Sequence, residues 1–126
     1  MKPATSTARG TVVLRRSALE TAGLVADGRA VLVDVREPEE WTTTGVAAPA
    51  HLLALGDLAN GRKQWRPFLE RNRDRELILY CLSGGRSAYA AGLLVAEGFS
   101  AGNMGRLESW LSAGLPIRHP NASEMP

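Results

Sequence analysis

Residues 77–87 read Leu-Ile-Leu-Tyr-Cys-Leu-Ser-Gly-Gly-Arg-Ser. The first four residues are apolar, as is typical of a strand covered on both faces of a parallel sheet. The strand stops at Cys81, Gly84 and Gly85 permit a tight turn, and a helix is expected over residues 86–97, ended by Gly98. The stretch therefore predicts a strand, a turn and a helix in succession, with the only cysteine of the chain at the end of the strand.

A similar apolar run at residues 30–33 predicts a second buried strand, which ends at Asp34. Ser17 and Glu20 have the spacing of a capping box, which predicts the start of a helix. Weaker strands are expected at 11–14, 51–55 and 99–103, and helices at 17–26, 37–44, 56–60, 63–72 and 107–113. This alternation predicts an α/β domain with a mainly parallel five-stranded sheet and helices on both faces.

The composition is that of an ordinary globular domain. The chain has 126 residues, of which 44% are apolar and 22% charged, so whole-chain disorder and a fibrous fold are excluded. No apolar run is long enough to span a membrane, and the N-terminus lacks the apolar core of a signal peptide, so we expect no membrane association. The tryptophans are expected to pack in the core, and these are Trp41, Trp65 and Trp110.

The numbers of charged residues, cysteines and histidines argue against several other classes of protein. The net charge is +2 and acidic residues are interspersed with basic ones, so we expect no nucleic-acid partner. A single cysteine excludes an internal disulfide and predicts a reducing compartment, the cytoplasm. With one cysteine and two histidines, neither a metal site nor a cofactor is expected.

The chain is expected to divide into an N-terminal tail (residues 1–10), one domain (11–119) and a C-terminal tail (120–126). The first ten residues are small and polar, and the last seven show no hydrophobic periodicity of a helix or strand. Inside the domain, basic residues gather between Arg62 and Arg75. Two interpretations remain open for this cluster: a solvated helix face, or a docking face for an acidic partner.

Cys81 is the candidate for chemistry. Ligands of open α/β sheets bind beyond the carboxyl ends of the strands, which is where Cys81 lies. A glycine-rich loop can direct backbone N–H groups inward, and a following helix adds its partial positive charge. Both effects lower the pKa of a thiol, so we expect a thiolate nucleophile that is reachable by solvent and needs no histidine base. The alternative is a cysteine that only fills space in the core.

Three segments together resemble the rhodanese family of sulfurtransferases. They are Val-Leu-Val-Asp-Val-Arg-Glu-Pro-Glu-Glu-Trp at residues 31–41, the loop from Cys81 to Ser87, and residues 103–116 with their glycine, tryptophan and Ala-Gly-Leu-Pro. The resemblance covers residues 11–118. It implies a single rhodanese domain and an enzyme of the thiosulfate sulfurtransferase type.

The resemblance also implies a role for each site residue. Cys81 would take a sulfane sulfur from a small anionic donor such as thiosulfate, hold it as a persulfide, and pass it to cyanide or a thiol, including a thiol on a protein. Arg86 would help to hold the anionic donor. Asp34 and Arg36 would be support residues, which either tie neighbouring loops together or tune the field at Cys81. The substrate-binding residues would be Leu82, Ser83, Gly84, Gly85, Arg86 and Ser87.

The chain departs from the family pattern in two places. Residues 45–50 read Gly-Val-Ala-Ala-Pro-Ala where members often carry Gly-His-x-Pro-Gly-Ala, so substrate preference is open. Family members usually have Gly-Gly before the last helix, and this chain has Gly105-Arg106 there. Arg106 is either a residue that attracts anionic donors to the pocket or an exposed arginine at a helix end.

Two other functions stay open on the sequence. One is a sulfur carrier or docking module without turnover, for which the Arg62–Arg75 cluster would be the docking face. The other is a cysteine phosphatase or arsenate reductase. Four residues separate Cys81 from Arg86, one fewer than in those relatives, so the loop suits one added sulfur atom better than a phosphate-sized oxyanion.

Overall fold

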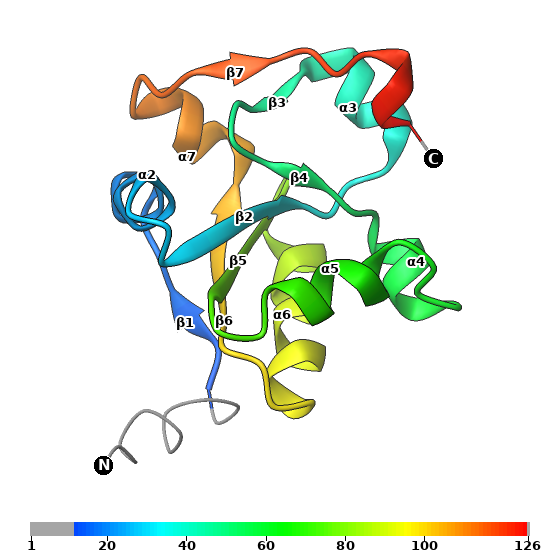
Figure 1. Ribbon diagram of the computed structural model, residues 1–126. Helices are drawn as coiled ribbons and strands as arrows, with labels where there is room; N and C mark the ends of the chain where they lie inside the picture. The colour runs from blue at the N-terminus through cyan, green and yellow to red at the C-terminus, as the bar shows by residue number, and fades with distance from the viewer. Residues whose placement is uncertain (1–11, 126) are drawn as a thin grey trace.

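The computed structural model describes residues 12–125, and the predicted N-terminal tail lies outside them. Five strands form one parallel sheet in the order β1-β6-β5-β2-β4. Their bounds are β1 Leu14–Arg15, β2 Ala30–Asp34, β4 His51–Leu52, β5 Glu76–Cys81 and β6 Ala101–Arg106. The predicted α/β class and five-stranded sheet are confirmed, and β5 lies at the centre of the sheet (Figure 1).

Helices cover both faces of the sheet (Figure 1). They are α2 Ala18–Ala26, α3 Pro38–Thr44, α4 Leu55–Ala59, α5 Trp65–Arg71, α6 Gly85–Ala96 and α7 Leu107–Ser112. The predicted capping box is present, since Ser17 Oγ accepts from the Glu20 N–H at 3.1 Å and Glu20 accepts from the Ser17 N–H at 2.8 Å. None of the helices within residues 12–125 is long and apolar enough to span a membrane.

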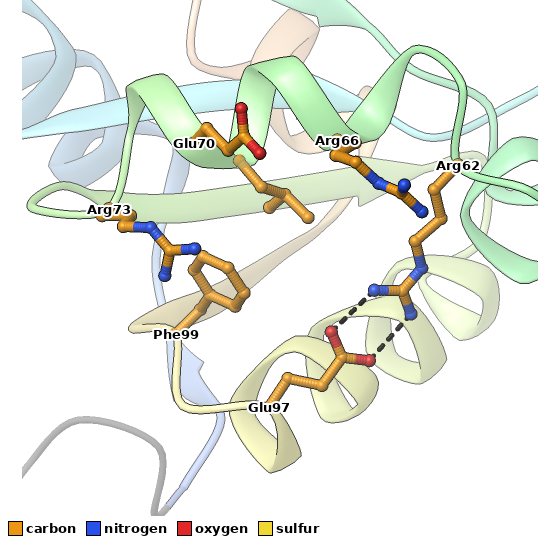
Figure 2. A pocket seen from close by; sticks show the side chains of 7 residues that line it. Arg62, Arg66, Glu70, Arg73, Glu97 and Phe99 are labelled. Atoms are coloured by element: carbon orange, nitrogen blue, oxygen red, sulfur yellow. Dashed lines mark hydrogen bonds and ion pairs between the residues drawn. The ribbon is translucent and has the colours of Figure 1, made fainter.

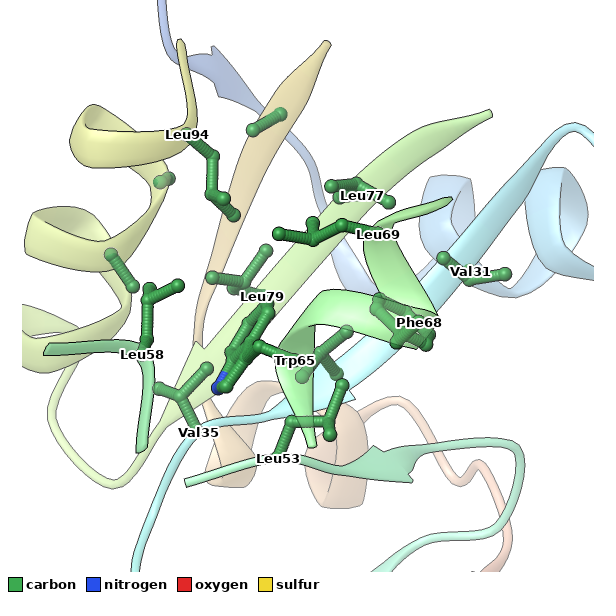
Figure 3. Packing of buried hydrophobic residues seen from close by; sticks show 14 of the residues in the cluster. Val31, Val35, Leu53, Leu58, Trp65, Phe68, Leu69, Leu77, Leu79 and Leu94 are labelled. Carbon is green, nitrogen blue, oxygen red and sulfur yellow. The ribbon is translucent and has the colours of Figure 1, made fainter. Parts of the chain in front are cut away.

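Side chains alternate across β2 and β5, and this alternation divides the core into two layers. Val31, Val33, Leu77 and Leu79 pack beneath α4, α5 and α6, with Trp65 in the middle (Figure 3). The residues between them, such as Leu32 and Ile78, pack on the other face with α2 and α7. The predicted core tryptophans are all buried, and each indole N–H finds an acceptor.

The boundaries of three strands differ from the sequence prediction. The strand expected at 11–14 is β1, Leu14–Arg15. Only His51 and Leu52 pair with β2, because Leu55 already begins α4. The last strand runs over residues 101–106 and not 99–103, because the chain turns at Gly98, where φ is +96°, before it joins the sheet. The strand ends three residues later than predicted, so Gly105 and Arg106 lie inside β6, next to the end of β5.

A second, antiparallel pair was not predicted. β3 (Val46–Ala47) pairs with β7 (Ile117–Arg118), and the Arg118 side chain donates to the carbonyls of Ala48 and Ala50. Two-residue strands carry no readable period, so only the tertiary structure reveals them. A 3₁₀ helix, η1 (Ala122–Glu124), follows β7, and Arg118 forms an ion pair with Glu124.

Candidate active site

Cys81 is the last residue of β5, and the loop that follows it leads directly into α6. Gly84 is the residue before the helix and has a φ of +100°, which side chains strongly disfavour. This conformation turns the Gly84 N–H back toward the sulfur of Cys81, at 3.0 Å. The predicted strand, turn and helix are therefore present, and the turn directs a peptide dipole at the thiol.

The thiol is polarised by its own loop. Ser87 Oγ lies 3.4 Å from Cys81 Sγ and donates to it. Burial raises the pKa of the thiol, but the Ser87 hydroxyl and the backbone N–H groups of Ser87, Gly84 and Ser83 lower it, and the lowering prevails. Within the described chain, the hydrogen-bond donors to the sulfur come from this loop and not from a histidine.

The prediction that Cys81 is reachable by solvent is wrong. The exposed fraction of Cys81 is 0%, and its side chain joins the core layer beneath α6. The reason is the alternation along β5, which directs residue 81 to the same face as Leu77 and Leu79. The next residues differ, because Leu82 is 54% exposed and Ser83 is exposed as well.

Arg86 does not present an unpaired charge to the loop. Its Nη1 and Nη2 bind the two carboxylate oxygens of Glu40 in α3, at 2.7 and 2.9 Å. Hydrogen bonding from Arg86 is the main cause that lowers the pKa of Glu40 to about 2, so the pair is ionised at neutral pH. The resemblance implies that Arg86 helps to hold an anionic donor, and this role stays a prediction for a guanidinium that is paired with Glu40. The pattern of the sequence does not reveal Glu40 as a partner of Arg86, because 46 residues separate them.

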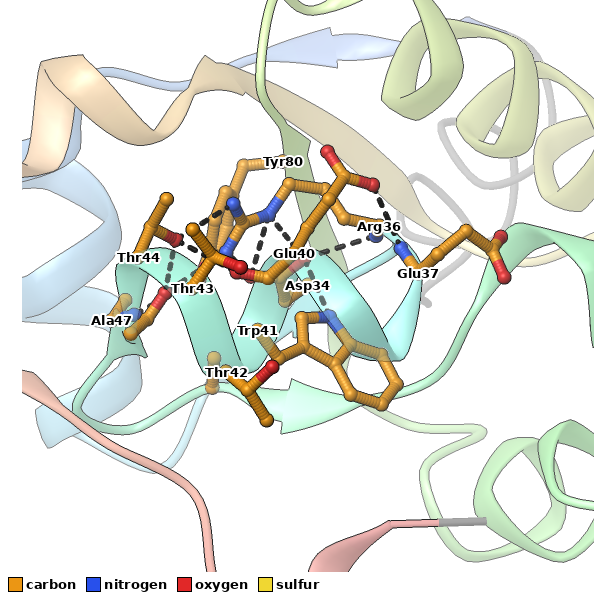
Figure 4. A network of polar contacts seen from close by, with 12 residues as sticks. Asp34, Arg36, Glu37, Glu40, Trp41, Thr42, Thr43, Thr44, Ala47 and Tyr80 are labelled. Atoms are coloured by element: carbon orange, nitrogen blue, oxygen red, sulfur yellow. Dashed lines mark hydrogen bonds and ion pairs between the residues drawn. The ribbon is translucent and has the colours of Figure 1, made fainter.

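Asp34 and Arg36 form a fully buried ion pair between the end of β2 and α3 (Figure 4). Arg36 Nη2 donates to Asp34 Oδ2 at 2.8 Å and to the Gly45 carbonyl at 3.0 Å, while Trp41 Nε1 donates to Asp34 at 3.1 Å. The pair joins the end of β2 to α3 and to the residue before β3. Residues 45–50, which begin at Gly45, are the segment where the chain departs from the family pattern. The Tyr80 hydroxyl also holds this segment, because it accepts from the Ala47 N–H.

Arg106 and His51 lie apart from the sulfur's hydrogen bonds. The backbone of Arg106 is in register with Cys81, but its side chain is exposed and pairs with Glu108 at 2.7 Å. His51 contacts the ring of Phe68, and burial lowers the pKa of its imidazole. Among residues 12–125, no three His, Cys, Asp or Glu side chains are grouped so that they could hold a metal ion.

Comparison with known proteins assigns the chain to a family. The model of the rhodanese-like domain matches residues 17–113. The chain belongs to this family. A sulfurtransferase from Allochromatium vinosum is 29% identical over 96 residues, which cover 71% of this chain and 79% of the relative. This likeness and the family together support a sulfurtransferase-type function for the domain.

Two solved structures extend the likeness. The human single-domain sulfurtransferase TSTD1 superposes with a TM-score of 0.65 at 26% identity, over 80% of this chain and 97% of that one. A protein of unknown function from Rhodopseudomonas palustris, described as a possible tyrosine phosphatase, has a TM-score of 0.69 at 26% identity, over 84% and 85% of the two chains. This rhodanese-like domain therefore has the fold of the family.

The basic cluster of this rhodanese-like domain lines a groove at the other end of α6 (Figure 2). Arg62 binds Glu97 through two contacts of 2.7 Å, and the Arg73 guanidinium lies 5.7 Å from the centre of the Phe99 ring. Cys81 precedes the first turn of α6, whereas Glu97 follows its last. The groove is thus separate from the sulfur, and a docking role for it stays a prediction.

Proposed function

We propose that this domain transfers a sulfane sulfur through a persulfide on Cys81. The single observation that supports it most is the polarised sulfur at the carboxyl end of β5, which accepts hydrogen bonds from the Gly84 N–H and the Ser87 hydroxyl. Amide and hydroxyl donors favour an anionic sulfur, whether it belongs to the thiolate or to a persulfide. The cytoplasm stays the predicted compartment, because the chain has a single cysteine.

The reaction has two half-reactions. In the first, the Cys81 thiolate attacks the outer sulfur of the donor. A new S–S bond forms, the donor's bond to that sulfur breaks, and the donor remainder leaves with the electron pair, as sulfite when the donor is thiosulfate. In the second, cyanide or a thiolate attacks the outer sulfur of the persulfide, and the electron pair of the broken bond returns to Cys81. The products are thiocyanate or a new persulfide.

The loop residues have distinct roles in this scheme. The backbone from Leu82 to Ser87 cradles the outer sulfur, and the Ser87 hydroxyl stabilises negative charge. Arg86 holds the loop against α3 through Glu40, at 2.7 and 2.9 Å. Asp34 and Arg36 support the end of β2 and α3.

An intact mass spectrum tests the covalent step. We expect incubation with thiosulfate to add the mass of one sulfur atom to the wild-type chain and nothing to Cys81→Ser. Since the chain has one cysteine, any gain is assigned to it without mapping. If thiosulfate and other sulfane donors all leave the wild-type mass unchanged, the proposal fails.

Turnover assays separate the remaining alternatives. We expect repeated formation of thiocyanate from thiosulfate and cyanide, and no hydrolysis of aryl phosphates. Sulfur uptake without turnover by any small acceptor would favour a carrier that serves a protein acceptor. Hydrolysis of aryl phosphates would overturn the proposal in favour of the phosphatase alternative, to which the description of the Rhodopseudomonas palustris protein gives weight.

A further inference from the structure

Asn103 connects β6 to the loop that holds Cys81. Its Oδ1 accepts from the Gly105 N–H at 2.9 Å, and its Nδ2 donates to the Gly84 carbonyl at 3.4 Å. The first contact determines the orientation of the amide, because a backbone N–H can face only the oxygen. The NH₂ group must then face Gly84, whose carbonyl can only accept.

The same asparagine lies where β6 is irregular. Asn103 pairs with Leu79 and Gly105 pairs with Tyr80, so Met104 is an extra residue in β6. Gly105 has a φ of +96°, and its Cα lies 3.6 Å from the position that a Cβ on Gly84 would take. The bulge brings the two glycine backbones together, and the Asn103 amide bridges them.

The Gly84 carbonyl competes with the sulfur for one proton. The Ser87 hydroxyl has a single proton, and three acceptors lie near it: Cys81 Sγ at 3.4 Å, the Gly84 carbonyl at 3.2 Å and the Gly105 carbonyl at 3.5 Å. A carbonyl oxygen has two lone pairs. At Gly84, the Ala88 N–H takes one at 3.1 Å, and the Asn103 amide takes the other.

We propose that Asn103 is a positioning residue for the reactive sulfur: its amide fills the acceptor capacity of the Gly84 carbonyl, the nearer of the two competing carbonyls, and so favours donation of the Ser87 hydroxyl proton to Cys81. Asn103 touches neither the sulfur nor a substrate and acts through Ser87. The inference deepens the proposed function, because the thiolate that Ser87 stabilises is the attacking group in that reaction.

A double-mutant cycle on thiol ionisation tests this inference. The ultraviolet absorbance of the thiolate is titrated against pH in the wild type, Asn103→Leu, Ser87→Ala and the double variant, with Cys81→Ser subtracted as background. This readout needs neither substrate nor access of a reagent to the buried sulfur. Asn60→Leu, at the exposed end of α4, is the matched control and should titrate as the wild type does.

We expect Asn103→Leu to move the thiol midpoint upward, so that the thiolate fraction below the midpoint falls about threefold, as suits the partial loss of one hydrogen bond. We expect no further movement when the same change is made in Ser87→Ala, because the proton in question is then absent. An unchanged midpoint in Asn103→Leu, or an equal shift in both backgrounds, would overturn the inference.

A second variant covers the case in which Asn103→Leu does not fold. Asn103→Asp keeps the acceptor for the Gly105 N–H but presents no donor to the Gly84 carbonyl. Its charge also raises the thiol midpoint, but that contribution acts equally in both backgrounds. A larger shift with Ser87 present than with Ser87→Ala supports the inference, and equal shifts refute it. These titrations are independent of the mass gain with thiosulfate, so the proposed function can fail while this inference holds, and the reverse.

Discussion

The sulfur of Cys81 is subject to two opposing effects at the scale of single residues. Burial disfavours the thiolate, whereas the donors at Gly84 and Ser87 favour it. All of these donors lie within six residues of the cysteine, so the hydrogen bonds to the sulfur come from the loop and the first turn of α6. Such a site favours the thiolate through hydrogen bonds to the sulfur, without a histidine beside it.

Glu40 is ionised chiefly because Arg86 binds its carboxylate. Replacing Glu40 should therefore change the free energy of unfolding only at pH values where the carboxylate is ionised. Its pKa of about 2 lies below the ordinary value of 4.5, so its ion pair with Arg86 stabilises the fold above pH 4.5, and this contribution is lost as the pH falls toward 2. We expect Glu40→Gln to lower the free energy of unfolding by about 1 kcal/mol at neutral pH, because the pair is partly exposed.

Urea denaturation at neutral pH and near the pKa of Glu40 measures this difference, which should shrink at the acid end. Glu39→Gln is the matched control, since Glu39 lies in the same first turn of α3. Equal losses for the two variants would show that the effect comes from the helix end and not from Arg86.

At the scale of elements, the junction of β5 and α6 depends on one backbone conformation. Gly84 has a φ of +100°, whereas its neighbour Gly85 is the first residue of α6 and does not have a positive φ. A Cβ on Gly84 would meet its neighbours at ordinary contact distances, beginning at 3.6 Å. The requirement for glycine there is therefore conformational and not steric.

We expect Gly84→Ala to cost about 1–3 kcal/mol of stability, the usual strain of a disfavoured backbone conformation. Relief of that strain would also turn the N–H away from Cys81 and raise the thiol midpoint. Gly85→Ala is the control, with no neighbouring atom within 4 Å of its Cβ, and should cost nothing. Chemical denaturation of both variants is the measurement, and similar losses would contradict this explanation of the loop.

At the scale of the whole molecule, the buried pair of Asp34 and Arg36 connects the main sheet to the segment that begins the small β3–β7 pair. Both side chains are 0% exposed, so the desolvation of each charge is offset only by its partner and its hydrogen bonds. The hydrogen-bond partners of the pair are Thr44, the Gly45 carbonyl and Trp41, and the pair is satisfied by them without a hydrogen bond to the sulfur.

Arg36→Met should therefore cost about 3–5 kcal/mol, because it leaves the Asp34 carboxylate buried without its countercharge. The double variant Asp34→Asn and Arg36→Met should recover part of that loss, since the amide oxygen still accepts from Trp41. Equilibrium denaturation compares the two variants. If the double variant is no more stable than the single one, the buried charge is not the source of the loss.

The sequence alone determined the features that depend on neighbours along the chain. The apolar runs at residues 30–33 and 77–80 predicted the two central strands, and the Ser17 capping box predicted the start of α2. The glycines after Cys81 predicted a turn that directs backbone donors at the thiol. These features follow from backbone conformation and from side-chain period, both of which are read within a few residues.

Only the tertiary structure decided the contacts between distant segments. It placed Glu40 on Arg86, Asn103 on Gly84 and β3 against β7, and it buried the sulfur that we expected to be accessible. Each of these outcomes depends on how the helices and strands pack against one another, which local preferences do not specify. The physical reason is that a hydrogen bond between residues tens of positions apart depends on their arrangement in space and leaves no periodic signal in the chain.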